Sequence, residues 1–355
     1  MIPVEDLLRL VLDEGGSDLH ITVGAPPTLR LNGQVTKLQV PSLTAAETEE
    51  LVRAVTKDEQ LKRVYEQGGT DFALAFREDA RFRVSVFLQK GSLGMVCRLL
   101  PKKILTPREI GLPPALDSLI ELPRGLILVT GPTGSGKTTT LASLLNVLNE
   151  GSRKHIITLE DPIEYFHEHK KGLINQREIG VDVPTFAEGL KRALRQDPDV
   201  ILVGEMRDLE TMEAAVTAAE TGHLVFSTLH TTGAARTIDR IIDAFPTGAK
   251  EQIRTQLAGN LRAVLSQILL ARADGRGRVA AFELLVNTSS VATLIRENKT
   301  HRLAGDIQTG TKYGMVSLEA SLVELCARGT ITRESVLAKA QDPQVATQLL
   351  QDVQQ

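Results

Sequence analysis

The sequence predicts an α/β protein in which a small α+β domain precedes a larger domain built on a parallel sheet. Three observations predict this fold class. Up to residue 100, short runs alternate apolar and polar residues, as strands of an antiparallel sheet with one buried face do. After residue 108, short apolar runs alternate with helical patterns, which favours a sheet of parallel strands with helices on both of its faces. A glycine-rich loop joins the first of these strands to the first of these helices.

Composition sets the broad class of the protein. The 355 residues, 42% of them hydrophobic, suffice for two domains with full-sized cores. A net charge of −3 and 3% aromatic residues argue against a nucleic-acid partner. The two cysteines, Cys97 and Cys326, form no CxxC pair, which excludes a tetracysteine zinc site and fits a reducing compartment. The start lacks a secretory signal and no apolar run reaches membrane-spanning length, so we expect a cytoplasmic protein.

The first domain, residues 1–100, is expected to combine helices with a mostly antiparallel sheet. In its last strand, Phe82, Val84 and Val86 face one side, while Arg81 and Arg83 face the other. In order, we expect a helix that carries Val4, Leu7, Leu8, Val11 and Leu12 and stops at Gly15, a strand over 17–23, a hairpin around Asn32 and Gly33, a helix opened by a capping box of Thr44 and Glu47, and strands over 71–76 and 81–88.

The second domain, residues 109–340, follows a linker over residues 101–108, where Pro101 and Pro107 bracket a basic segment. Beyond Lys250 the sequence predicts helices. We expect strands over Leu126–Thr130, Ile156–Glu160, Val200–Val203 and Leu224–Ser227, a helical stripe of Ile253, Leu257, Leu261, Leu265 and Ile268, and a helix over residues 317–328. Residues 341–355 are a polar, glutamine-rich tail to which we assign no role.

The glycine-rich loop indicates nucleotide binding. Residues 131–138, GPTGSGKT, match the phosphate-binding loop pattern, with an apolar strand before them and a helix after them. Glycines let the loop curl its N–H groups around a triphosphate, and the helix N-terminus adds positive potential. Lys137 would reach the β- and γ-phosphates, and Thr138 would ligate Mg²⁺. The predicted binding residues are Gly131, Pro132, Thr133, Gly134, Ser135, Gly136, Lys137, Thr138 and Thr139.

Carboxylates follow two of the expected core strands. Residues 160–164, Glu-Asp-Pro-Ile-Glu, end the second strand, at the edge of the sheet where ligands sit, and one carboxylate there would orient the attacking water. The alternative is an Asp-Pro turn with solvated acids. Gly204 and Glu205 come directly after Val200–Val203, where an acid would hold the water shell of Mg²⁺. The alternative there is a plain buried strand.

Histidines and arginines supply further candidates. His223 precedes the strand at 224–227 and His230 follows it, so an imidazole could report on the γ-phosphate, although each histidine could also be structural. His167 and His169 suggest a metal pair, but a solvated polar loop explains them better. The arginines at 81 and 83 are either a solvated strand face or arginine fingers, supplied by domain closure or by a neighbour in a ring.

Together these motifs resemble the secretion-and-pilus (type II/IV secretion) ATPase superfamily. Thr158–Glu164 is similar to its acidic box, Asp197–Asp208 to its Walker B signature, and Thr221–Thr231 to its histidine box, in the same order. The chain length, the single small N-terminal domain and the missing tetracysteine point to the PilT branch, the type IV pilus retraction motors. One stretch departs from that branch. Its Ala-Ile-Arg-Asn-Leu-Ile-Arg-Glu motif is matched here by residues 290–297, Ser-Val-Ala-Thr-Leu-Ile-Arg-Glu.

The resemblance implies a PAS-like first domain, a RecA-like core with a helical C-terminal part, and a homo-hexamer with ATP sites between subunits. It implies a Mg²⁺-dependent ATPase motor for pilus retraction and twitching, at the inner face of the cytoplasmic membrane. Its partners would be an inner-membrane platform protein and a second pilus ATPase. By family role, Glu164 would polarise the attacking water with Glu160 beside it, Glu205 would support Mg²⁺, His223 and His230 would sense the nucleotide, and Arg81 and Arg83 would act in trans.

Other functions stay open at this point. The incomplete motif at 290–297 leaves an accessory pilus ATPase paralogue as an alternative. A nucleotide-gated regulatory or assembly subunit would bind ATP and barely hydrolyse it. A P-loop phosphotransferase would need an acceptor pocket for a small substrate, and a DNA-pumping ring is weakened by the near-neutral charge.

Overall fold

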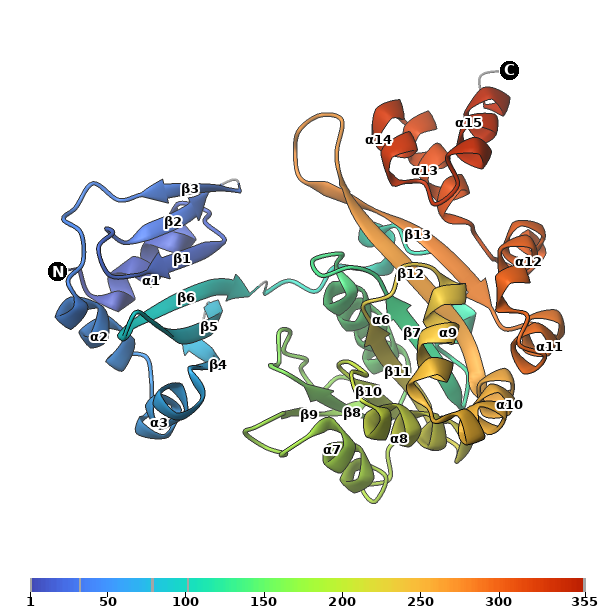
Figure 1. Ribbon diagram of the computed structural model, residues 1–355, viewed down its shortest axis with the longest axis horizontal. Helices are drawn as coiled ribbons and strands as arrows, with labels where there is room; N and C mark the ends of the chain where they lie inside the picture. The colour runs from blue at the N-terminus through green and yellow to red at the C-terminus, as the bar shows by residue number, and fades with distance from the viewer. Residues whose placement is uncertain (1, 32, 78–79, 101, 354–355) are drawn as a thin grey trace. The chain divides into compact units, whose positions relative to one another are not determined.

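The computed structural model describes residues 2–31, 33–77, 80–100 and 102–353. The chain divides into two compact units (Figure 1). The first consists of Met1–Lys103 with Pro162–Phe166, and the second of Ile104–Asp161 with His167–Gln355. Each unit has a sheet and a hydrophobic core of its own.

The first unit is a six-stranded antiparallel sheet with helices packed on one face. The prediction of helices combined with a mostly antiparallel sheet is confirmed, while α3 and β6 were not predicted. The strand order is β3-β2-β1-β6-β5-β4. The hairpin of β2 and β3 is confirmed, with Arg30 opposite Val35, while Asn32 lies outside the described residues. The elements are α1 (Val4–Asp13), β1 (Asp18–Ile21), β2 (Thr28–Leu31), β3 (Gln34–Lys37), α2 (Ala45–Arg53), α3 (Asp58–Gln67), β4 (Gly69–Phe76), β5 (Ala80–Gln89) and β6 (Ser92–Leu100).

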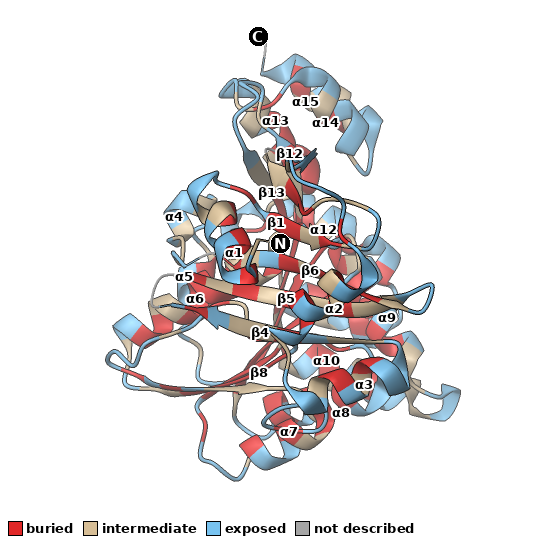
Figure 2. Ribbon diagram, turned by 90° about the vertical axis from the view of Figure 1, so that its left-hand side faces the viewer, coloured by how far each residue is buried: buried red, intermediate tan, exposed pale blue. Residues whose placement is uncertain are grey.

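Apolar and polar residues alternate along the strands of this unit, and this alternation decides which face of the sheet is buried (Figure 2, buried residues in red). In β5 the side chains of Phe82, Val84 and Val86 are fully buried against the helices. Arg81 and Arg83 occupy the opposite face, as period-two geometry requires. The predicted capping box is also present, because Thr44 Oγ1 accepts from the N–H of Glu47, whose carboxylate accepts from the N–H of Thr44.

The second unit is built on a seven-stranded sheet, ordered β13-β12-β7-β11-β10-β8-β9. All neighbours pair in parallel except β13, which is antiparallel to β12. The four predicted core strands are confirmed. The elements are α4 (Pro107–Ile110), α5 (Leu116–Leu119), β7 (Gly125–Thr130), α6 (Lys137–Gly151), β8 (His155–Glu160), β9 (Leu173–Glu178), α7 (Phe186–Ala193), β10 (Val200–Val203), α8 (Leu209–Glu220), β11 (Leu224–Leu229), α9 (Ala234–Ala244), η1 (Thr247–Ala249), α10 (Lys250–Asn260), β12 (Leu261–Ala271), β13 (Arg278–Val286), α11 (Ser289–Arg296), η2 (Thr300–Arg302), α12 (Leu303–Thr309), η3 (Thr311–Tyr313), α13 (Leu318–Ala327), α14 (Arg333–Lys339) and α15 (Pro343–Asp352).

One predicted helical stripe is wrong. Leu261, Leu265 and Ile268 do not continue the helix of Ile253 and Leu257 but lie in β12. That strand pairs with β7 on one side and with β13 on the other. A strand buried on both faces is apolar almost throughout, so its leucines also recur at helical spacing, and periodicity alone does not separate the two structures.

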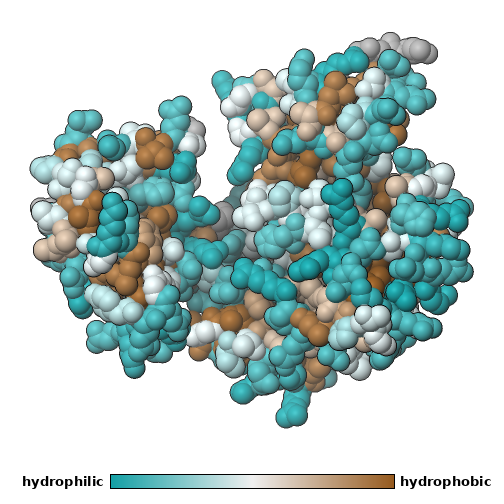
Figure 3. All heavy atoms as spheres, in the orientation of Figure 1, coloured by the Kyte–Doolittle hydropathy of each residue, from teal (hydrophilic) through white to brown (hydrophobic). Residues whose placement is uncertain are grey.

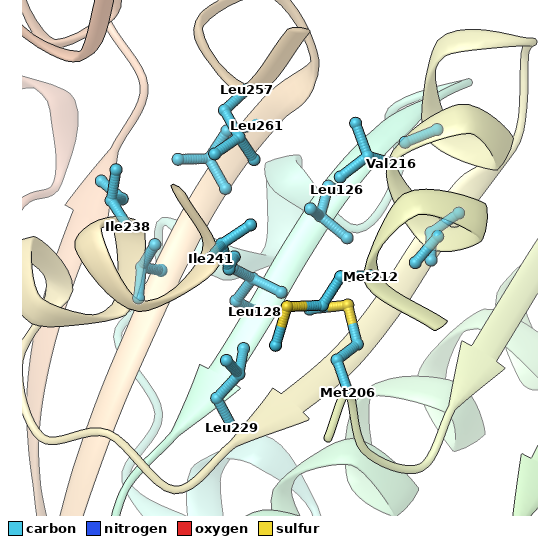
Figure 4. Close-up of a cluster of buried hydrophobic side chains, with 14 of the residues drawn as sticks. Leu126, Leu128, Met206, Met212, Val216, Leu229, Ile238, Ile241, Leu257 and Leu261 are labelled. Atoms are coloured by element: carbon cyan, nitrogen blue, oxygen red, sulfur yellow. The ribbon is translucent and has the colours of Figure 1, made fainter. Parts of the chain in front are cut away.

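The central strand β7 divides the core of this unit into two layers. Leu126 and Leu128 pack into the cluster under helices α7 to α11, and Ile127 and Val129 into the cluster under α5 and α6. Figure 4 shows the first cluster, with Met212 beside Leu128. All residues of β7 are buried, so the loop that follows it starts from a fixed point.

The C-terminal helices pack on the far part of the β12–β13 hairpin. Leu270 and Ala281 of the hairpin join one apolar cluster with Leu318, Ala346 and Leu350. The polar tail therefore contains an ordered helix, α15, with one buried stripe. Hydrophilic residues cover most of the visible face of each unit (Figure 3). Within the described ranges, none of the helices combines the length and apolarity needed to cross a bilayer.

Candidate nucleotide-binding site

The loop between β7 and α6 has the backbone shape of a phosphate cradle. Gly131, Gly134 and Gly136 have φ of 144°, 78° and 90°, values that favour glycine. A Cβ at Gly134 would have no heavy atom within 4 Å, so the loop surface there is open. No side chain of the described residues caps the N-terminus of α6, which leaves its first N–H groups able to face an anion.

Polar side chains of this loop fit a phosphate group. Lys137 is 9% exposed, and its Nζ donates to the carbonyls of Gly131 (2.8 Å) and Pro132 (3.2 Å). The ammonium therefore lies within the curl of the loop. The buried hydroxyl of Ser135 has no hydrogen-bond partner among the residues that the structure describes. A held cation, an unpaired hydroxyl and uncapped N–H groups together fit a polyphosphate.

A line of contacts joins this loop to the carboxylate that follows β10. Thr133 Oγ1 lies 3.4 Å from His230 Nδ1, and His230 Nε2 lies 3.4 Å from Glu205 Oε2. Arg207 Nε lies 2.7 Å from the same carboxylate oxygen. The strands β7, β10 and β11 run parallel, so their carboxyl ends meet at one edge and bring Thr133, Glu205 and His230 together.

The two acidic-box glutamates have different surroundings. Glu160, 8% exposed at the end of β8, accepts hydrogen bonds from Thr158 Oγ1 (2.6 Å) and Gln176 Nε2 (3.0 Å). Glu164 belongs to the segment 162–166 that packs with the first unit. There its Oε1 lies 3.7 Å from Arg83 Nη1. The guanidinium carbon of Arg81 lies 3.1 Å from the ring centroid of Phe166 in the same segment.

His223 lies away from the phosphate loop of its own chain. It precedes β11, and its carbonyl accepts from the N–H of Gly125, at the start of β7. The loop at residues 131–136 follows the other end of β7, roughly 20 Å away at the rise of a strand. The structure therefore brings His230, but not His223, to the loop.

The histidines at 167 and 169 lie in a loop, as expected, but only His169 is exposed, and His167 is half-buried rather than solvated. His169 Nδ1 accepts from the N–H of Ile174 at 3.2 Å. Burial, together with the smaller effect of the nearby charge of Lys170, lowers the pKa of His167 to about 4. Among the described residues, no group of three or more His, Cys, Asp and Glu could hold a metal ion on its own.

Sequence reasoning missed the residues that brace the site from β12 and β13. Gln267 of β12 contacts the phosphate loop, and Ser266 Oγ accepts from the N–H of Gly233 at 2.9 Å. In β13, Glu283 accepts from the N–H of Ala234 at 2.7 Å, which caps α9 just after the His230 loop. The sequence did carry a signal, since Ser266 and Gln267 are neighbouring polar residues in an otherwise apolar run.

Glu283 is expected to make the stability of this region depend on pH. Burial raises the pKa of Glu283, and the nearby Glu319 adds to the rise against the opposing N–H of Ala234. A carboxyl with a raised folded pKa loses its contribution to stability as pH rises through that value. Glu283→Gln, neutral at every pH and still able to accept from Ala234, is therefore expected to raise the Tm at about pH 8 and to lose this advantage towards about pH 4. The measurement is thermal unfolding across this pH range. A Tm difference between Glu283→Gln and the unmutated protein that does not change with pH would contradict the raised pKa of Glu283.

The fold and the site define a P-loop nucleotide-binding protein of the α/β class. A family model described as "Type II/IV secretion system protein" matches residues 2–310, and the chain belongs to this family. It is 47% identical over 341 residues to the type IV pilus retractation ATPase PilT of Pseudomonas aeruginosa, covering 96% of this chain and 99% of that protein. It is 48% identical over 317 residues to a twitching motility protein of Neisseria gonorrhoeae, covering 89% and 84%. The crystal structure of the pilus retraction motor PilT with bound ADP matches with a TM-score of 0.90 and 44% identity, covering 97% of this chain and 99% of that one.

Proposed function

We propose that this protein is a Mg²⁺-dependent ATPase motor that drives type IV pilus retraction, and thereby twitching motility. The observation that carries the proposal is the contact line Thr133–His230–Glu205, which ties a phosphate cradle to a carboxylate placed for metal-assisted hydrolysis. The similarity to PilT along nearly the whole chain supports the coupling of this hydrolysis to a pilus.

In this proposal each residue of the site has one task. Lys137 and the N–H groups of the loop bind the phosphates of ATP, and Glu164 polarises the attacking water, with Glu160 beside it. Thr138 and Glu205 would hold Mg²⁺, which neutralises charge on the β- and γ-phosphate oxygens when bound. His230 bridges the loop and Glu205, so a shift of the loop after γ-phosphate release reaches the carboxylate through one imidazole.

The proposed assembly is a homo-hexameric ring with ATP sites completed by neighbouring subunits. Each subunit would consist of a PAS-like first domain (residues 1–100), a linker (101–108), a RecA-like core (109–340) and a tail (341–355). Arg81 and Arg83 of the first domain would act in trans on the core of the next subunit. His223 lies at the opposite sheet edge from its own loop, so any nucleotide that it senses has to be bound by another subunit. The ring would work in the cytoplasm at the inner membrane face, with an inner-membrane platform protein and a second pilus ATPase as partners and no nucleic acid.

The segment that departs from the PilT motif keeps its helical packing. It forms α11, in which Val291, Leu294 and Ile295 are buried. Of the four departures, Ser290 and Thr293 are exposed and Ala292 is half-buried, while the buried Val291 replaces one apolar β-branched residue by another. The difference from the motif therefore changes mainly the solvent-facing side chains of α11. This change favours an accessory pilus ATPase paralogue as the second candidate.

Deleting the gene tests the retraction function. A retraction motor pulls pili back, so its loss is expected to abolish twitching while pili stay on the cell surface. The measurement is colony spreading beside electron microscopy of surface pili, with the unmutated gene restored as the control. Retained twitching would favour the accessory paralogue, and loss of the pili themselves would contradict a retraction role.

A further inference from the structure

We propose that Gln267 is a positioning residue that holds the phosphate-binding loop in its binding shape. Its side-chain amide bridges the loop and the helix behind it. Nε2 donates to the carbonyl of Ser135 at 2.6 Å, and Oε1 accepts from Thr140 Oγ1 at 2.9 Å. Gln267 is 1% exposed and Thr140 is fully buried, so water does not substitute for either bond.

The sheet brings Gln267 to the loop. β12 runs parallel to β7 with Ser266 opposite Thr130, so Gln267 comes level with Gly131, where the loop begins. The packing is close at both ends of the loop. A Cβ at Gly131 would lie 2.2 Å from the carbonyl oxygen of Gln267, and one at Gly136 would lie 3.3 Å from its Nε2. The glycines therefore serve contact with Gln267 as well as backbone curvature.

The chemistry requires an amide at this position. A loop that aims its N–H groups at phosphate turns carbonyls the other way, and the Ser135 carbonyl needs a donor there because it faces buried structure. Thr140, one turn into α6, needs an acceptor. A glutamine supplies both from one rigid group, whereas a glutamate supplies only the acceptor and a methionine supplies neither. Gln267 therefore ties the loop and α6 to β12 as one unit.

Binding of ADP to the full chain tests the role, because it needs no turnover. Gln267→Glu keeps the size and the bond from Thr140, but it places a carboxylate against the Ser135 carbonyl. It is expected to weaken ADP binding by roughly 10- to 100-fold in calorimetry, the effect of an unpaired buried group. Gln267→Met, which keeps the volume, is expected to weaken binding by roughly 10-fold, and Thr140→Val by less. KM for ATP should rise more than kcat falls.

The controls separate this role from simple packing and from the proposed function on which it rests. Each variant's Tm is measured without nucleotide. Variants that melt like the unmutated protein and bind ADP within about two-fold of it would overturn the positioning role. If the Gln267 variants fail to fold, the ADP affinity of Thr140→Val alone tests the proposal. An unchanged ADP affinity of Thr140→Val would then overturn the positioning role of Gln267. If the unmutated chain itself does not bind ADP, the ATPase proposal fails instead.

Discussion

Lys137→Ala is expected to abolish ATP hydrolysis. The ammonium of Lys137 sits within the curl of the loop, held by the carbonyls of Gly131 and Pro132, so it is already placed for phosphate. Alanine removes the one side-chain cation of the loop that would offset the charge developing on the β- and γ-phosphate oxygens. Losing a preorganised group of this kind lowers kcat by roughly 10²–10³-fold or more. The measurement is phosphate release at saturating Mg²⁺ and ATP.

A matched control makes this result specific. Lys171→Ala removes an exposed lysine of the same unit and is expected to leave turnover unchanged. Equal rates for Lys137→Ala and the unmutated protein would contradict the site. The same assay addresses the regulatory alternative, because a nucleotide-gated subunit would bind ATP tightly and barely hydrolyse it before any mutation. Glu164→Gln, expected to bind ATP without hydrolysing it, shows what such a protein would look like.

Two inactive variants are expected to restore activity to each other when they are mixed. Lys137→Ala spoils the phosphate loop but keeps Arg81 and Arg83. The double variant Arg81→Ala with Arg83→Ala keeps the loop, but loses charges whose removal costs roughly 10³–10⁵-fold when they act as arginine fingers. In rings mixed at random, roughly a quarter of the sites pair an intact loop with intact arginines from the next subunit.

The control for this experiment uses the geometry of the site. Thr133, His230 and Glu205 are joined within one chain, so the loop and Glu205 belong to the same half of any shared site. Mixing Lys137→Ala with Glu205→Gln is therefore expected to restore nothing. Recovery in both mixtures would mean that Lys137 and Glu205 of one active site come from different subunits, against the contacts within one chain. Recovery in neither mixture, in rings shown to contain both variants, would show that the arginines act within their own chain.

Local sequence predicts the phosphate loop because local constraints decide its shape. The apolar run before Gly131 is too short for a typical helix and leads directly into the glycine-rich loop, which together favour a buried strand. The glycines and Lys137 follow from what a triphosphate demands. The positions of Glu205 and His230 also follow from sequence, since both come directly after parallel strands. Because His223 precedes β11 and His230 follows it, the sequence also implies that the two histidines lie at opposite edges of the sheet. The role that the family resemblance gives to His223 did not take this into account.

The parts that sequence did not predict depend on contacts between distant segments. Nothing local distinguishes β12 from a helix, because only pairing with β7 and β13 makes it a strand. The contacts of Gln267 with Ser135 span 132 positions in the chain, and those of Glu283 with Ala234 span 49. Burial of Ala346 and Leu350 likewise depends on helices that pack on the hairpin.

Glu283 joins two parts of the second unit that are far apart in the sequence. One of its oxygens caps α9 behind His230, and the other lies 3.4 Å from Nε2 of Gln341, at the junction of α14 and α15. The backbone N–H of Gln341 also donates to the buried Glu319. Two hydrogen bonds through one carboxylate thus connect the start of α15 with the start of α9, so a displacement of α15 is expected to be transmitted to the segment that follows His230.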